Sequence, residues 1–242
     1  MRAVIISISF MLFFVGCADK SAVHADFDED DFEAEFASND EFDPLSGYNR
    51  AMTAFNDAAY RYAIIPTAKG YSKIVPKGAR DSINNFFDNL IFPSRLVNNL
   101  LQGKFSNAAS ETGRFIINTT VGFLGFANVA DEIYGMQKHD EDFGQTLGVW
   151  GVPSGPHVAL PLLGPSNVRD IGGMVTDYLL KSQYDTGFFE ENWQNYALTG
   201  FKTFNGLADF APMYETLTKD AIDLYPLMKN AYEQRRDKLI KE

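Results

Sequence analysis

The chain has 242 residues, 45% of them hydrophobic, which is enough for one domain with a buried core. Its formal net charge of −11 arises near the N-terminus, because residues 44–242 carry 19 lysines and arginines against 21 aspartates and glutamates. This nearly neutral part lacks the basic excess typical of nucleic-acid binding, and the single cysteine excludes an internal disulfide.

The first 16 residues have the pattern of a signal peptide. Arg2 supplies one positive charge, and Ala3–Val15 is an apolar run too short for a helix that spans a bilayer, which needs about 20 residues. The four residues that end at Cys17 resemble a bacterial lipobox, so we expect cleavage before Cys17 and acylation of that cysteine. Ala18 follows it in place of the inner-membrane retention residue Asp, which favours the outer membrane. The alternatives are a buried free thiol or an ordinary signal peptide beside an incidental cysteine.

Residues 17–43 predict a tether between the lipidated cysteine and the folded part. Asp26–Asp43 contains ten acidic residues and no basic one, which is typical of a solvated, self-repelling linker. Four phenylalanines within the same stretch leave docking on a partner as the alternative.

Residues 44–242 are predicted to form a single all-α domain of several broken helices. Asp43 followed by Pro44 has the pattern of a helix start, and apolar residues then recur at spacings of three and four up to Tyr62, so we expect a helix that ends before Pro66. The same reasoning, with prolines and glycines as boundaries, predicts further helices over residues 67–74, 83–90, 93–103, 105–121, 167–180, 188–210 and 213–240, the last of them started or kinked by Pro226.

The middle of the chain has a different composition. Twelve of the 19 glycines fall between Gly103 and Gly173, which favours turns, short helices and extended segments. Phe115–Ala130 and Val158–Leu163 are nevertheless strongly apolar, so they are expected to lie either in the core or in lipid. Beyond Cys17 no apolar run reaches the length of a membrane-spanning helix.

Few polar residues have the spacing of a reactive site. His139–Asp142 could hold a metal, but a solvated turn is the simpler interpretation, and His157 is expected at the surface or at a rim. Arg169 is expected to form a buried ion pair with Asp170 or Asp177. We expect no metal and no cofactor.

A hydrolase would need a nucleophile on a sharp turn. Gly164-Pro165-Ser166 begins such a motif, but Val168 occupies the position of the second glycine. Ser166 is better interpreted as a helix N-cap, and we expect no enzyme activity.

Four blocks of the chain, in the same order, resemble the MlaA (VacJ) phospholipid-removal lipoproteins, and the likeness covers about residues 43–240. The blocks are Asp43–Met52, Arg114–Phe126 with Asn128–Ala130, Glu141–Val152, and Gly155-Pro156 with Leu160–Ser166 and Arg169-Asp170.

The resemblance implies a helical disc or ring in the periplasmic leaflet of the outer membrane, with an amphipathic channel through it. It implies that mislocalised outer-leaflet phospholipid passes through the channel to a soluble periplasmic carrier, which feeds an inner-membrane ABC transporter. It also implies a trimeric porin as the outer-membrane partner. The rival interpretations are a structural tether on the porin that moves no lipid and a phospholipid hydrolase.

One segment invites a mechanical hypothesis. Gly122 and Gly125 follow the predicted 105–121 helix and bracket apolar residues, so they could be hinges of a gating segment whose Phe123, Leu124 and Phe126 face lipid or the channel. The alternative is that both are ordinary turn glycines.

Overall fold

A computed structural model describes residues 43–183, 192–219 and 221–242. The signal peptide, Cys17 and the acidic tether up to residue 42 lie outside the described residues, as do residues 188–191 of one predicted helix. Within the described ranges the all-α prediction is confirmed: one small hairpin accompanies a series of helices. The elements in chain order are α3 (Ser46–Ala59), η1 (Tyr60–Ile64), α4 (Ile65–Ile74), α5 (Lys77–Leu90), α6 (Phe92–Leu101), α7 (Phe105–Thr120), α8 (Val129–Glu132), α9 (Phe143–Val149), β1 (His157–Leu160), β2 (Gly164–Asn167), α10 (Val168–Gln183), α11 (Asn192–Thr218) and α12 (Leu224–Lys241).

The first long helix departs from the prediction at both ends. It begins at Ser46, and Asp43 accepts a hydrogen bond from the Leu45 N–H at 3.0 Å in the turn before it. It does not end before Pro66, because α3 continues through the π-helical turn η1 into α4. In that wider turn the Ile65 N–H bonds to the carbonyl five residues earlier, and Pro66 follows as the second residue of α4.

Of the next three helices, α6 and α7 agree with the predicted bounds to within two residues, whereas α5 begins six residues before the predicted 83–90 helix. Pro76 separates α4 from α5, Pro93 lies in the first turn of α6, and α7 ends one residue short of the predicted Val121. The predicted Ser166 N-cap is wrong. Ser166 lies in β2, and it is the Asn167 side chain that accepts the Asp170 N–H at 2.8 Å at the start of α10.

The predicted 213–240 helix is divided in two. Its first residues belong to α11, which reaches Thr218 and contains Pro212, and α12 starts at Leu224. Asp223 caps α12 by accepting the Tyr225 N–H, and Pro226 lies in its first turn, as expected for a helix-starting proline.

The glycine-rich middle folds as predicted into short helices and extended segments. Strands β1 and β2 pair antiparallel, with His157 opposite Asn167 and Leu160 opposite Gly164. The other edge of β1 is covered by α3. Asn49 donates to the His157 carbonyl and accepts the Ala159 N–H, so that a side-chain amide takes the place of a neighbouring strand. Asn56, two turns further on, likewise donates to the Leu160 carbonyl and accepts the Leu162 N–H.

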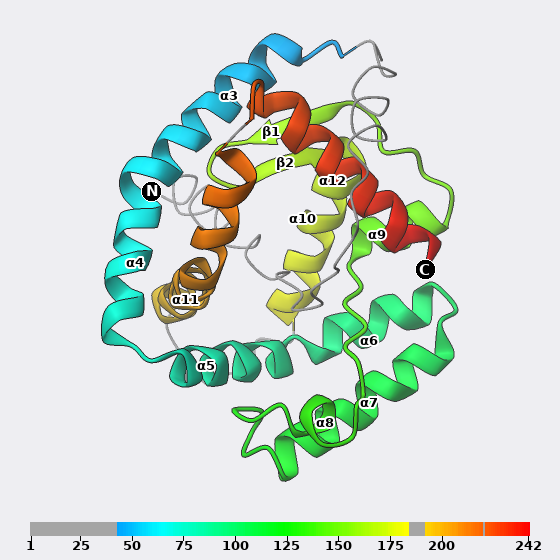
Figure 1. The fold of residues 1–242 in the computed structure, drawn as a ribbon. Coiled ribbons are helices and arrows are strands. Elements are labelled where there is room, and N and C mark those ends of the chain that lie inside the picture. Colours follow the sequence, from blue (N-terminus) through cyan, green and yellow to red (C-terminus); the bar gives the residue numbers. More distant parts are fainter. Residues whose placement is uncertain (1–42, 184–191, 220) are drawn as a thin grey trace.

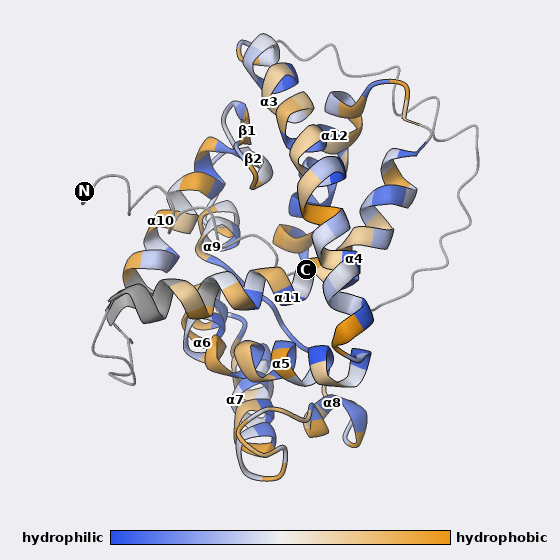
Figure 2. Ribbon diagram, turned by 90° about the vertical axis from the view of Figure 1, so that its left-hand side faces the viewer, coloured by the Kyte–Doolittle hydropathy of each residue, from blue (hydrophilic) through white to orange (hydrophobic). Residues whose placement is uncertain are grey.

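The helices α3 to α6 follow the outline of the molecule, and the hairpin and α12 lie beside α3, across the molecule from α5 and α6 (Figure 1). Between them, α11 packs on α4 through an apolar cluster of Ile65, Ala68, Leu207, Ala211 and Tyr214. Helices α7 and α8 and the turn that joins them form one end of the molecule (Figures 1 and 2). In the described ranges, every helix is too short or too polar to span a bilayer. The predicted amphipathic channel stays a prediction.

Candidate functional site

The interior of the described part is more polar than that of an ordinary globular protein. Buried polar and charged residues outnumber buried hydrophobic ones, 21 to 12, whereas asparagine, arginine and glutamate are usually exposed. The largest side chains with almost no exposed surface are Glu111, Asn49, Asn98, Asn99, Asn167, Asn205, Thr146 and Ser166. The hydrogen bonds of these groups, rather than apolar packing alone, therefore join the helices to one another.

The exterior of the described part, in contrast, carries many large hydrophobic side chains. On α3, the apolar residues of the predicted helical face point outward, since Leu45, Tyr48 and Phe55 are exposed. Exposed large hydrophobic residues recur on other elements as well, among them Leu90, Leu100, Leu101, Phe105, Ile116, Val121, Ile133, Tyr134, Trp150, Val168, Leu179, Phe201 and Met213. Hydrophobic colour accordingly recurs along α3, α5, α7 and α11 (Figure 2). So much apolar surface in water is unfavourable, by about 25 cal/mol per Å², and it marks a surface that contacts lipid or protein.

The predicted lipid-facing residues lie within this exterior. Phe123 is 74% exposed and Leu124 is 56% exposed, and both adopt left-handed backbone angles in the turn after α7. Phe126 stacks on Phe86 of α5 at 4.7 Å between ring centroids. The turn therefore presents Phe123 and Leu124 outward, while the ring of Phe126 stacks on α5.

The two predicted hinge glycines are tightly enclosed. A Cβ on Gly122 would lie 2.3 Å from the Ala127 carbonyl oxygen, and one on Gly125 would lie 2.5 Å from Asn89 Cβ. Gly125 also has a φ of +93°, which side-chain-bearing residues rarely adopt. The described conformation thus requires glycine at both positions. Movement of the segment stays a hypothesis.

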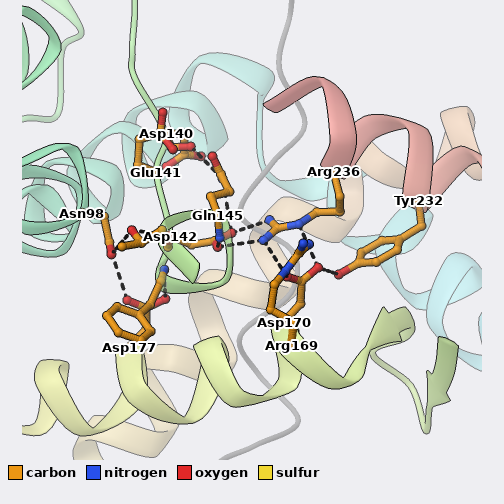
Figure 3. A network of polar contacts seen from close by, with 12 residues as sticks. Asn98, Asp140, Glu141, Asp142, Gln145, Arg169, Asp170, Asp177, Tyr232 and Arg236 are labelled. Atoms are coloured by element: carbon orange, nitrogen blue, oxygen red, sulfur yellow. Dashed lines mark hydrogen bonds and ion pairs between the residues drawn. The ribbon is translucent and has the colours of Figure 1, made fainter. Parts of the chain in front are cut away.

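A network centred on Arg236 joins α12, α9 and α10 (Figure 3). Its guanidinium donates to both oxygens of Asp142, at 2.6 and 2.9 Å, and to Asp170 at 3.1 Å. Asp170 also accepts from Arg169 at 2.9 Å and from the Tyr232 hydroxyl at 2.7 Å. Burial alone would raise the pKa of Asp170, but the Arg169 hydrogen bond and the nearby Arg236 charge hold it below its ordinary value.

This network confirms the predicted buried ion pair between Arg169 and Asp170. The alternative partner, Asp177, lies elsewhere on α10. Its carboxylate accepts hydrogen bonds from Ser94 and Asn98 of α6 and from the Phe143 N–H (Figure 3).

The Asp177 carboxyl gives the protein a predicted pH dependence. Burial raises its pKa from 3.8 to about 6, against the hydrogen bond from the Phe143 N–H. Between these values the folded state holds the proton more tightly than the unfolded state does, so the contribution of Asp177 to stability falls as the pH rises from about 4 to 6. We expect the loss to approach about 3 kcal/mol, at 1.36 kcal/mol per pKa unit.

Chemical denaturation of the wild type and of Asp177→Asn at several pH values from 4 to 7 measures how the contribution of Asp177 to the free energy of unfolding depends on pH. The difference between the two stability curves should slope over that window and be flat above it, and a constant difference throughout contradicts the prediction.

The predicted solvated turn at His139–Asp142 is wrong, because its carboxylates have cationic partners. Glu141 is buried, and Lys104 lies 2.7 Å from it. Asp142 binds Arg236 and caps α9 through the Gln145 N–H. These carboxylates are therefore engaged in joining elements.

His157 is likewise not a surface residue. It lies buried in β1, where its Nδ1 contacts the Glu233 carboxylate of α12 at 2.9 Å. Ser166, the other residue considered for chemistry, has no exposed surface and so offers no accessible hydroxyl in this conformation.

Sequence reasoning missed one buried ion cluster. Glu111 of α7 accepts from Arg95 of α6 at 2.7 Å and from the His139 N–H at 2.7 Å, and Arg114 lies 3.5 Å away. Arg114 extends the cluster to the Met136 carbonyl and to Asn128. Glu111 and Arg114 have the i, i+3 spacing of a helical ion pair, which could have signalled half of the cluster, whereas no spacing rule links them to Arg95 or His139. Arg114 and Asn128 also belong to the second block of the family resemblance.

Comparison with known proteins identifies relatives over most of the chain. Residues 41–239 match the family model described as MlaA lipoprotein. The Escherichia coli intermembrane phospholipid transport system lipoprotein MlaA is 34% identical over 202 residues, which is 81% of this chain and 77% of the relative. The Haemophilus influenzae lipoprotein of the same name is 34% identical over 137 residues, covering 56% and 55% of the two chains.

A solved structure supports the same assignment. It was reported in work on the structural basis for maintenance of bacterial outer membrane lipid asymmetry, and its TM-score to this chain is 0.71 at 31% sequence identity. The match covers 83% of this chain and 100% of the solved one.

Proposed function

The chain belongs to the MlaA lipoprotein family, and from this premise we propose that it removes mislocalised phospholipid from the outer leaflet of the outer membrane and passes it to a soluble periplasmic carrier. The observation that carries the proposal is the inverted distribution of side chains, with asparagines and ion pairs inside and large apolar residues outside. A protein lying in a single membrane leaflet needs an apolar exterior, and a path for a charged head group needs a polar wall.

The mechanism would be passive. A phospholipid that crosses hydrocarbon must carry its charged head group through a medium in which unpaired charge is costly. Polar side chains along a protected path lower that barrier without a covalent step. Ser166, the only serine considered as a nucleophile, is fully buried, which supports transport over hydrolysis.

The proposed function also assigns a role to each segment of the chain and names its partners. Residues 1–16 would be a signal peptide, residues 17–43 a tether, and residues 44–242 the lipid-handling domain on the periplasmic side of the outer membrane. A trimeric porin would hold the domain in that membrane, and an inner-membrane ABC transporter would receive lipid from the carrier. Movement of the turn around Gly122 and Gly125 would open or close the lipid path.

The lipid anchor makes a separate prediction. Mass spectrometry of the mature protein, extracted from membranes, should show an acylated N-terminal Cys17, because the signal sequence ends in a lipobox-like motif. Cys17→Ala should accumulate as an uncleaved or mislocalised precursor. An unmodified Cys17 in the membrane-extracted protein would exclude the anchor.

Deletion of the gene tests the transport function. We expect phospholipid to accumulate at the cell surface and detergent sensitivity to rise, and the wild-type gene on a plasmid to restore both. A plasmid that carries Asp177→Asn serves as a matched control. This substitution is buried and local, so we expect it to restore surface phospholipid and detergent resistance as the wild-type gene does. Surface phospholipid that stays at the wild-type level in the deletion strain contradicts transport and favours the porin-tether alternative.

A further inference from the structure

Helices α11 and α5 pack on each other (Figures 1 and 2). Four charged side chains from these helices and from the connection between α8 and α9 meet there. Lys202 comes from α11, Asp88 from α5, and Lys138 and Asp140 from the connection between α8 and α9. The Lys138 amine lies 3.4 Å from the Asp88 carboxylate and 3.3 Å from the Asp140 carboxylate. The Lys202 amine lies 4.0 Å from Asp88. We call these four residues the charge quartet; its two positive and two negative groups are formally neutral.

Lys202 has the least complete bonding within the charge quartet. Its distance to Asp88 exceeds the length of a hydrogen bond, and the described residues provide its amine with no other ion-pair partner. Its side chain is only 18% exposed, and burial lowers its pKa although Asp88 and Asp140 oppose the shift. A largely buried ammonium with three donors and one distant acceptor is stabilised by any anionic oxygen that reaches it.

The neighbouring Arg95–Glu111 pair behaves differently. Its charged atoms approach to 2.7 Å and both side chains are buried, so it is closed to a ligand. Lys202 of the charge quartet is instead 4.0 Å from the Asp88 carboxylate, and the Asp88 side chain is 34% exposed. A ligand could reach these groups and form shorter, charge-assisted bonds of about 2.7–2.9 Å.

We propose that the charge quartet binds the head group of a zwitterionic phospholipid, with the phosphate on Lys202 and Lys138 and the ammonium group on Asp88 and Asp140. The inference rests on the proposed transport function and adds the class of lipid that the protein handles. A zwitterionic head group matches the alternating charges and adds no net charge to them. An anionic head group would place an unpaired negative charge beside two carboxylates, which is unfavourable at a partly buried site.

Short-chain lipids test the site on the full-length protein purified in mild detergent. The probes are dihexanoyl phosphatidylethanolamine, dihexanoyl phosphatidylglycerol, dihexanoylglycerol, which lacks phosphate, and inorganic phosphate, each titrated while thermal unfolding is followed. We expect dihexanoyl phosphatidylethanolamine to bind more tightly than dihexanoyl phosphatidylglycerol. Dihexanoylglycerol and inorganic phosphate should both bind far more weakly than either phospholipid.

Variants separate the two halves of the site. Lys202→Gln should weaken binding of both phospholipids by about tenfold or more, because a charge-assisted hydrogen bond is lost. Lys202→Arg, which keeps the charge, should retain most of the affinity. Asp88→Asn should reduce the preference for the ethanolamine lipid. Lys69→Gln is the matched control, since Lys69 pairs with Glu215 at the surface of α4 and α11 and should leave binding unchanged.

Three results would overturn the inference: binding by Lys202→Gln within twofold of the wild type, inorganic phosphate binding as tightly as the phospholipids, or dihexanoylglycerol binding as well as they do. The second result would indicate a simple anion site. The inference fails separately from the proposed function, because gene deletion reports on transport whatever Lys202 does. A deletion strain with excess surface phospholipid, fully corrected by Lys202→Gln, retains the function and rejects the site.

Discussion

Glu111→Ala is expected to destabilise the protein by about 3–5 kcal/mol, the cost of breaking a buried ion pair from one side. Glu111 has no exposed surface, and its carboxylate is the shared partner of Arg95 and Arg114. Removing it leaves two buried guanidinium groups without that partner and frees the His139 N–H. Because Glu111 joins α6, α7 and the connection to α9, the loss affects the packing of all three.

Thermal and chemical unfolding in mild detergent measures the effect, which corresponds to a fall in Tm of roughly 10 °C for a domain of this size. Glu215→Ala is the matched control. Its ion pair with Lys69 is shorter than most in the protein, at 2.6 Å, but both side chains are about half exposed. Solvent screening limits such a pair to about 1 kcal/mol or less. Equal losses in the two variants would contradict a stabilising role for the buried cluster.

Periodicity predicted the helices well because it depends on local geometry. The spacing of apolar residues from Leu45 to Tyr62 identified α3 correctly, and Pro93 placed the start of α6 within one residue, whereas α5 begins at Lys77, six residues before the predicted start. The end at Pro66 was wrong because a π-helical turn can carry a chain past a proline, and a π turn has no residue pattern that distinguishes it from an α-helix.

The same periodicity could not show which face of α3 is buried. An apolar stripe is ordinarily assigned to the core, but on α3 the apolar residues point outward and the buried positions are Asn49 and Asn56. These asparagines lie seven residues apart, on one helical face, and their partner is a strand edge about a hundred residues further along the chain. A helix pattern contains no information about so distant a partner.

Of the polar interior, the sequence predicted only the buried ion pair of Arg169 and Asp170. Asn49, Arg114 and Gln145 belong to the blocks that carry the family resemblance and are also buried, but a matching block does not by itself indicate burial. The charge quartet was not predictable, because the connection between α8 and α9 reaches Asp88 of α5, and Lys202 of α11 approaches the same carboxylate, only in the folded chain.

Replacing Gly122 or Gly125 with alanine is expected to destabilise the protein by more than about 1 kcal/mol in each case. At Gly122 the new methyl group would meet backbone atoms, the carbonyl oxygens of Ala127 at 2.3 Å and Asn118 at 2.5 Å, which cannot rotate away as a side chain can. At Gly125 alanine would be held at a positive φ as well as against Asn89.

Gly70→Ala is the control for these substitutions. Gly70 lies in α4, and a methyl group added there would meet nothing within 4 Å. That change should therefore stabilise the protein by about 0.4–1 kcal/mol, because alanine has less freedom than glycine in the unfolded chain. Thermal unfolding of the three single variants distinguishes the positions, and an unchanged Tm for Gly122→Ala would mean that the turn adjusts more easily than its contacts indicate.

A test of the hinge hypothesis must therefore leave both glycines in place. The stacked rings of Phe86 and Phe126 offer one, since they lie 4.7 Å apart and join α5 to the turn. Cysteines at these two positions, bridged by a short bifunctional thiol reagent, would hold the turn on α5 without altering its backbone. If the turn must move for lipid to pass, the bridged protein should keep its stability but fail to correct surface phospholipid in the deletion strain, whereas the unbridged double variant should correct it. Full correction by the bridged protein would show that the turn acts as a fixed part of the fold.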